Sequence, residues 1–175
     1  QDYITLGNQI KCNPAIKTEA DRDAIIQAVL DDRIDIIASD HAPHTWEEKG
    51  EVYKNAASGL PLVQHTLQIM LTHWKEGRIS LERIIEKMCH APAECFNIVG
   101  RGYLEEGYFA DIVLLDLDRD TKVSKENILY KCGWSPLENQ TLPGTISGTW
   151  VNGVRLYDQD GVTGEPAGRR MVFNR

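Results

Sequence analysis

The stretch Ile34-Asp35-Ile36-Ile37-Ala38-Ser39-Asp40-His41-Ala42-Pro43-His44 joins a short apolar run directly to a group of polar residues. Its first five residues are rich in β-branched side chains, a composition typical of a buried strand. The polar residues then lie at the carboxyl end of that strand. Because ligands of parallel α/β sheets and barrels bind at those ends, the stretch predicts a strand that leads into a functional site.

The residues before this strand complete a predicted βαβ unit. Residues 4–12 can run extended up to Asn13-Pro14, where the residue before a proline is pushed out of the helical region. Thr18 can cap a helix that ends near Asp32. The apolar stripe of this helix consists of Ala24, Ile25, Ala28 and Val29. A strand, a helix and a second strand at this spacing predict two parallel strands.

The pattern after the site changes from helical to extended near residue 100. A polar loop over residues 45–59 precedes a predicted helix over 63–74, and Ser80 can cap another over 81–88. A strand is predicted at 111–116 and a hairpin at 145–158, around the turn dipeptide Asn152-Gly153. The expected domains are therefore residues 1–100 and a mainly β region over 101–175.

Composition narrows the class of protein. The 175 residues are 42% hydrophobic and 26% charged, as in soluble globular proteins, and no apolar run approaches the roughly 18 residues of a membrane span. A net charge of -7 without a basic cluster argues against a nucleic-acid partner. Four scattered cysteines indicate reduced thiols and a cytoplasmic location. Because the chain opens at Gln1, we expect a piece of a longer protein.

Two interpretations of Asp40 follow from the residues alone. In the first, Asp40 caps the next turn and the neighbouring histidines lie at the surface. In the second, Asp40 is a metal ligand or a general base, because a carboxylate is a hard ligand and can carry protons once a metal acidifies water. The remaining polar residues receive structural interpretations: Glu47-Glu48-Lys49 as solvated charge, and His65, His73 and His90 as surface or core-edge residues.

The whole string from Ser39 to His44, followed by Glu47-Glu48-Lys49, resembles the signature after the eighth barrel strand of dihydroorotases, members of the metal-dependent amidohydrolase superfamily. Five further segments resemble that family in the same order: residues 11–14, 101–104, 107–114, 131–136 and 149–153. The resemblance implies an α/β fold. It comprises the C-terminal part of a (β/α)₈ TIM barrel, with its last two βα units, followed by the C-terminal strands of a small composite β-sandwich.

The resemblance also implies roles for individual residues. Asp40 corresponds to the aspartate that binds the metal and exchanges the proton of the attacking hydroxide. His44 corresponds to a histidine that holds the substrate carboxylate, and Asn13 to a residue that hydrogen-bonds the substrate. Ser58 and Gly59 occupy the place of a pair whose backbone faces the pyrimidine ring.

The implied activity is the reversible hydrolysis of L-dihydroorotate to N-carbamoyl-L-aspartate in pyrimidine (UMP) biosynthesis, with one or two Zn²⁺ ions per active site. The alternatives are a hydantoinase- or allantoinase-type cyclic amidase, or a non-catalytic structural partner, for example of aspartate transcarbamoylase. His44 favours dihydroorotase, because the other amidases usually lack a second histidine. A homodimer is expected, with no membrane contact.

The family's remaining metal ligands have no counterpart in this sequence. Zinc generally needs three or four protein ligands, and Asp40 is the only candidate. We therefore expect the remainder of the same polypeptide to supply the others, and the 175-residue chain by itself to be inactive and metal-poor.

Overall fold

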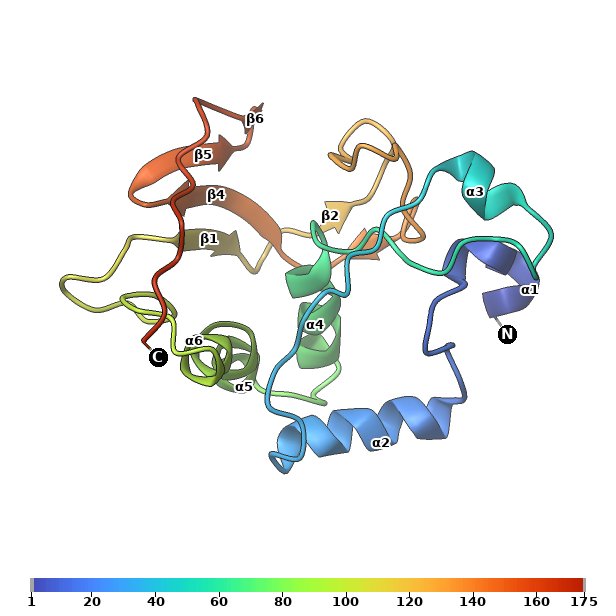
Figure 1. Cartoon of the computed structure of the whole chain (residues 1–175), viewed down its shortest axis with the longest axis horizontal. Helices are drawn as coiled ribbons and strands as arrows, with labels where there is room; N and C mark the ends of the chain where they lie inside the picture. Colours follow the sequence, from blue (N-terminus) through green and yellow to red (C-terminus); the bar gives the residue numbers. More distant parts are fainter. Residues whose placement is uncertain (1, 175) are drawn as a thin grey trace.

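A computed structural model describes residues 2–174, with helices in the first half of the chain and antiparallel strands in the second (Figure 1). The helical elements are α1 (Asp2–Leu6), η1 (Gly7–Ile10), α2 (Glu19–Leu30), α3 (Trp46–Gly50), α4 (Thr66–Lys75), α5 (Leu81–Ile85), the π-helical turn η2 (Glu86–His90) and α6 (Ala91–Cys95). The strands are β1 (Ile112–Asp116), β2 (Thr121–Lys122), β3 (Thr141–Leu142), β4 (Thr145–Val151), β5 (Val154–Asp158) and β6 (Gly161–Val162).

The extended segment predicted at residues 4–12 is wrong, since most of this stretch is helical, in α1 and η1. A strand satisfies its backbone groups through a neighbour, whereas a helical turn satisfies them locally. Within residues 2–174 no strand lies alongside this stretch, and it closes with a local bond from Lys11 N to Asn8 O at 3.0 Å.

The predicted helix after Thr18 is confirmed as α2. The Thr18 side chain accepts a hydrogen bond from Asp21 N, and the Asp21 carboxylate accepts one in return from Thr18 N. The apolar stripe is only partly buried, because Val29 is 6% exposed while Ile25 is 58% exposed. Val29 packs with Ile79 and Ile84 in a small core that α2 shares with α5.

The buried strand predicted at residues 34–38 is not formed, and its residues are half-buried or exposed and lie outside any strand. Ile37 N instead donates to Lys87 O at 3.0 Å, a carbonyl within the π-helical turn. Within the described residues, the single parallel pairing is an isolated bridge between His41 and Leu60. The predicted pair of parallel strands is therefore not formed, because neither segment has its partner beside it in this chain.

The two later helices and the β region agree with the sequence prediction. Ser80 Oγ accepts from Arg83 N and starts α5, which continues through η2 into α6. Strand β1 and the hairpin β4–β5 form an antiparallel sheet in the order β1-β4-β5-β6. Asn152 and Gly153 have φ angles of 51° and 81°, as a type I′ turn requires.

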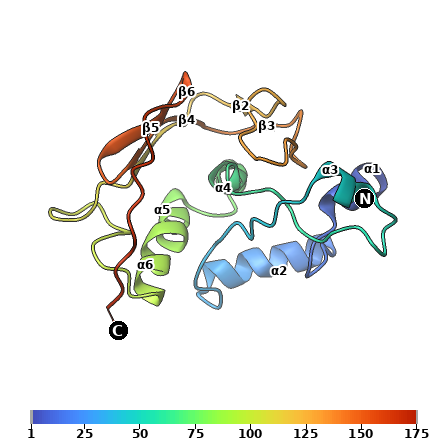
Figure 2. The ribbon, with the colours of Figure 1, turned by 45° about the horizontal axis from the view of Figure 1, so that its top comes forward.

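The sheet lies over one side of the helices, above α4 and α5 (Figure 2). Gln68 Nε2 of α4 donates to Gly144 O at 2.8 Å, and Leu71 of the same helix approaches that glycine. The C-terminal segment returns to the helical part, where Val99 N donates to Val172 O at 2.9 Å. The division into domains at residue 100 stays a prediction. Among residues 2–174 no helix is long and apolar enough to cross a membrane.

Candidate functional site

Asp40 follows residues 34–38 and stands exposed at the start of a loop. Its φ angle is 43°, in the left-handed region that few residues other than glycine, asparagine and aspartate adopt. Within residues 2–174 its carboxylate has no hydrogen-bond or ion-pair partner, so the structure shows no capping bond for it. The carboxylate is thus available to a ligand, and the unusual backbone angle is of the kind that clusters at functional sites.

The residue after Asp40 anchors this loop. His41 Nδ1 accepts from Leu62 N at 3.1 Å, which places the ring proton on Nε2 in the neutral form. Its backbone pairs with Leu60, and Ala42 N donates to Leu60 O at 3.1 Å. Residues 40–42 therefore run alongside residues 60–62. The sequence analysis gave His41 no such role.

His44 is half-buried and held from two sides. Its Nδ1 lies 3.3 Å from Glu48 Oε2, and its carbonyl accepts from Trp134 Nε1 at 2.8 Å. The Thr45 backbone N–H and, after it, the His44 ring lower the pKa of the Glu48 carboxyl. The loop at residues 131–136 thus supports the candidate site from the β region.

Gly59 is buried against the His44 loop. A Cβ atom at Gly59 would lie 2.3 Å from Ala42 O and 3.1 Å from His44 Cδ2, so a larger residue fits there only if the Ala42–His44 loop moves. Gly59 N donates to Lys11 O at 3.0 Å. The structure therefore brings His44 and Gly59 together, and it ties to them the segment that carries Asn13.

The other predicted site residues are placed less tightly. Asn13 and Ser58 are exposed, and their substrate-binding roles stay predictions. Among the described residues, no hydrogen bond or ion pair joins Asp40 to Asn13, His44 or Ser58. The arrangement offers one free carboxylate on the loop that carries His44, with Gly59 packed against that loop and the segment of Asn13 bonded to Gly59.

Lys49 is the residue that the sequence analysis missed. Its interpretation as solvated charge is wrong, because the residue is 2% exposed and its ammonium group donates to three backbone carbonyls. A signal was present in the sequence: Thr45 and Glu48 form a capping box that starts α3 and turns Lys49 inward. Burial lowers the pKa of Lys49.

The described residues do not form a complete metal site. No group of three or more His, Cys, Asp or Glu side chains within residues 2–174 is placed to hold an ion. The Asp40 carboxylate has the chemistry of a ligand and no partner among these residues. His65 is buried, and its Nδ1 lies 3.1 Å from the hydroxyl of Tyr130. His90 stacks on Tyr103 with ring centroids 4.2 Å apart.

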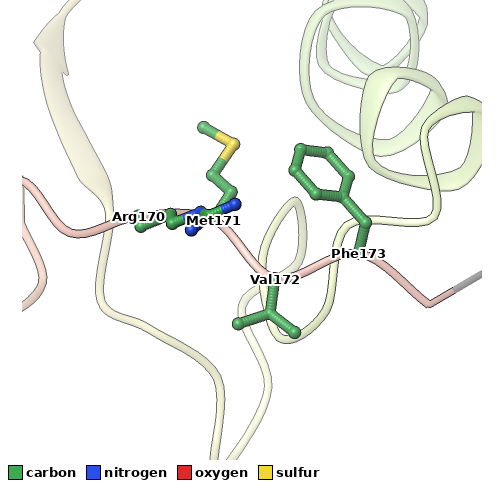
Figure 3. A pocket seen from close by; sticks show the side chains of 4 residues that line it. All are labelled: Arg170, Met171, Val172 and Phe173. Atoms are coloured by element: carbon green, nitrogen blue, oxygen red, sulfur yellow. The ribbon is translucent and has the colours of Figure 1, made fainter.

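One cavity lies elsewhere, in the C-terminal segment. It measures about 470 Å³ and is lined by Arg170, Met171, Val172 and Phe173 of the C-terminal segment (Figure 3). Met171 and Phe173 project to one side of the backbone and Val172 to the other (Figure 3). None of the five predicted site residues lines it.

Comparison with known proteins gives consistent results. The sequence profile of the amidohydrolase family matches residues 8–156. The dihydroorotase of Clostridium acetobutylicum is 36% identical over 159 residues, which are 90% of this chain and 37% of that protein. The dihydroorotase of Pyrococcus furiosus is 34% identical over 163 residues, which are 93% of this chain and 38% of that protein. The chain thus spans little more than a third of these relatives.

Solved structures show the same fold. An L-hydantoinase (dihydropyrimidinase) from Arthrobacter aurescens superposes with a TM-score of 0.84 at 32% identity, over 94% of this chain and 38% of that one. A D-hydantoinase (dihydropyrimidinase) from Thermus sp. superposes with a TM-score of 0.83 at 19% identity, over 90% of this chain and 36% of that one. The described residues therefore form a fragment of the TIM-barrel fold of metal-dependent hydrolases.

Proposed function

This chain belongs to the amidohydrolase family, and on that premise we propose that the complete protein is a dihydroorotase. It would interconvert L-dihydroorotate and N-carbamoyl-L-aspartate in pyrimidine biosynthesis. The observation that carries the proposal is the free carboxylate of Asp40, held at a positive φ angle on a loop that also presents His44. The dihydroorotases similar to this chain support the choice of substrate.

Asp40 would act as a proton carrier. An amide carbonyl is a poor electrophile, so its hydrolysis needs a base for the attacking water and an acid for the leaving nitrogen. One carboxylate oxygen of Asp40 can accept the first proton and return it to the ring nitrogen as the C–N bond breaks. Zn²⁺, when bound, would acidify the water and polarise the carbonyl. Asp40 would contribute one ligand, and residues outside this sequence the others.

His44, Asn13, Ser58 and Gly59 would bind the substrate. With His44 Nδ1 turned toward Glu48, its Nε2 can donate to a substrate carboxylate when the ring is protonated. Asn13 can both donate and accept, which suits an amide. The backbone at residues 58–59 would face a flat ring from the exposed Ser58, while Gly59 packs against Ala42.

A second candidate is a hydantoinase-type cyclic amidase. The observation that favours it is the likeness to the L-hydantoinase of Arthrobacter aurescens, which extends over most of this chain. Such an enzyme would open a related cyclic amide with the same proton carrier. The two candidates differ in the need for His44, because a hydantoin ring presents no matching carboxylate.

The proposal includes the surroundings of the site. Residues 1–100 would belong to the last part of the barrel and residues 101–175 to the C-terminal strands of a β-sandwich shared with the rest of the polypeptide. The complete protein would be a cytoplasmic homodimer with one or two Zn²⁺ ions per site. If the complete protein were non-catalytic, it would instead act as a structural partner, for example of aspartate transcarbamoylase.

The test is an assay of the complete polypeptide that contains these residues. We expect hydrolysis of L-dihydroorotate, its loss on chelation of the metal and its return with Zn²⁺. Preferential hydrolysis of hydantoin would support the second candidate. Full metal loading without turnover of either substrate would reject both, and co-elution with aspartate transcarbamoylase would then indicate the structural form.

A further inference from the structure

Lys49 lies at the centre of the loops that carry the candidate substrate contacts. It is part of α3, and its ammonium nitrogen donates to Lys11 O at 2.9 Å, Ala57 O at 3.0 Å and Gly59 O at 3.0 Å. An ammonium group has three donors, so these carbonyls satisfy it completely. Within the described residues no carboxylate forms an ion pair with it. A buried, unpaired charge is costly unless fully hydrogen-bonded.

The three carbonyls belong to the segments that the proposed function uses. Lys11 stands two residues before Asn13, and Ala57 and Gly59 flank Ser58. Lys11 O accepts from Gly59 N as well, so Lys49 reinforces a direct link between the two segments. A single side chain therefore sets the spacing between Asn13 and the backbone at residues 58–59.

Lys49 is also joined to the His44 loop. Its neighbour Glu48 meets the His44 ring, and the Lys49 ammonium lies 6.0 Å from the centre of the Trp134 ring. The indole N–H of that tryptophan donates to His44 O. Lys49 thus contacts the segment that carries Asn13, Gly59 itself and the tryptophan that binds His44 O, and within residues 2–174 none of its hydrogen bonds goes to Asp40.

We propose that Lys49 is a positioning residue for substrate binding, which fixes Asn13 and the Ser58-Gly59 backbone relative to His44. The proposal rests on the proposed function. Because Lys49 holds the binding segments and leaves Asp40 untouched, its loss should weaken substrate binding and spare proton transfer. A residue that served folding alone would lower the yield or the stability of the enzyme and leave KM unchanged.

The test compares Lys49→Met, Lys49→Arg and the control Lys75→Met in the complete polypeptide, with L-dihydroorotate and hydantoin as substrates. Lys75 forms an exposed ion pair with Asp120, so its replacement removes an ammonium group at a distance from the site. We expect Lys49→Met to raise KM about tenfold, equivalent to about 1.4 kcal/mol, with kcat changed less than about threefold. Lys75→Met should match the wild type.

Lys49→Arg supplies the rescue. It keeps the charge and several donors, so its KM should lie between those of the wild type and Lys49→Met. An unchanged KM in Lys49→Met, an equal loss in kcat and kcat/KM, or failure of both variants to fold would each overturn the proposal. If the wild type hydrolyses neither substrate, the proposed function itself fails and the positioning role falls with it.

Discussion

Replacing Gly59 by alanine tests whether the contact between the two site loops is as close as the structure shows. The added Cβ would lie 2.3 Å from Ala42 O and 2.7 Å from Ala42 Cβ. The φ angle of Gly59 is 152°, a conformation that an alanine adopts only under strain. The steric overlap with Ala42 and the backbone strain would both destabilise the folded protein at Gly59.

The expected size of the effect follows from this geometry. Ordinary contacts of a Cβ atom begin near 3.4 Å, so the Ala42–His44 loop must shift by about 1 Å. Overpacking of this kind costs about 1–3 kcal/mol and the strained backbone a similar amount, and we expect about 3 kcal/mol in the free energy of unfolding. A shift of about 1 Å at a substrate contact can lower the rate about a hundredfold.

The measurement is denaturant unfolding of the complete protein, followed by kcat/KM for L-dihydroorotate. Gly168→Ala is the matched control, because no atom lies within 4 Å of its added Cβ and its φ angle is not positive. That variant should unfold and react like the wild type. If Gly59→Ala were as stable and as active as Gly168→Ala, residues 42–44 and 59 would not be in contact.

Three further predictions concern single side chains. Asp40→Asn should lower kcat at least about a hundredfold, and equal turnover in steady-state assays would remove Asp40 from the mechanism. Thermal unfolding should not change, because the carboxylate has no partner within residues 2–174 and asparagine tolerates the positive φ angle. His44→Ala should raise KM for L-dihydroorotate more than for hydantoin, with unchanged zinc content by atomic absorption; a fall in zinc would make His44 a ligand. Burial lowers the pKa of His65 in the folded protein, so the unfolded chain takes up a proton first as pH falls. The free energy of unfolding should therefore decrease below about pH 6.5, by at most about 1.4 kcal/mol per pH unit. Urea titrations of the wild type and of His65→Gln at several pH values measure how the free energy of unfolding changes with pH. This change should be smaller in the variant, and equal changes would contradict the prediction.

Features that depend on a few neighbouring residues could be predicted from the sequence. The capping box of Thr18, the start of α5 at Ser80 and the turn at Asn152-Gly153 each involve contacts within four residues. Asp40 and His44 likewise share one loop because they are four residues apart. The identity and order of a few neighbouring residues therefore limit the possible local structures strongly.

Features that depend on partners far away in the chain could not be predicted from the sequence. Residues 4–12 and 34–38 have the composition of strands, but a strand forms only beside another strand, and the described chain supplies none for either segment. The interpretation of Lys49 was wrong for a related reason, since its carbonyl partners lie 38, 8 and 10 residues away.

The sequence by itself determined which chemical groups the candidate site contains and which short turns and helix starts surround them. Only the tertiary structure decided which of these groups are buried, which face solvent, and that Gly59 lies against the His44 loop. The physical reason is that side-chain chemistry and local backbone preferences are properties of a residue and its neighbours. Burial, strand pairing and the partners of a charged group depend on where the rest of the chain lies.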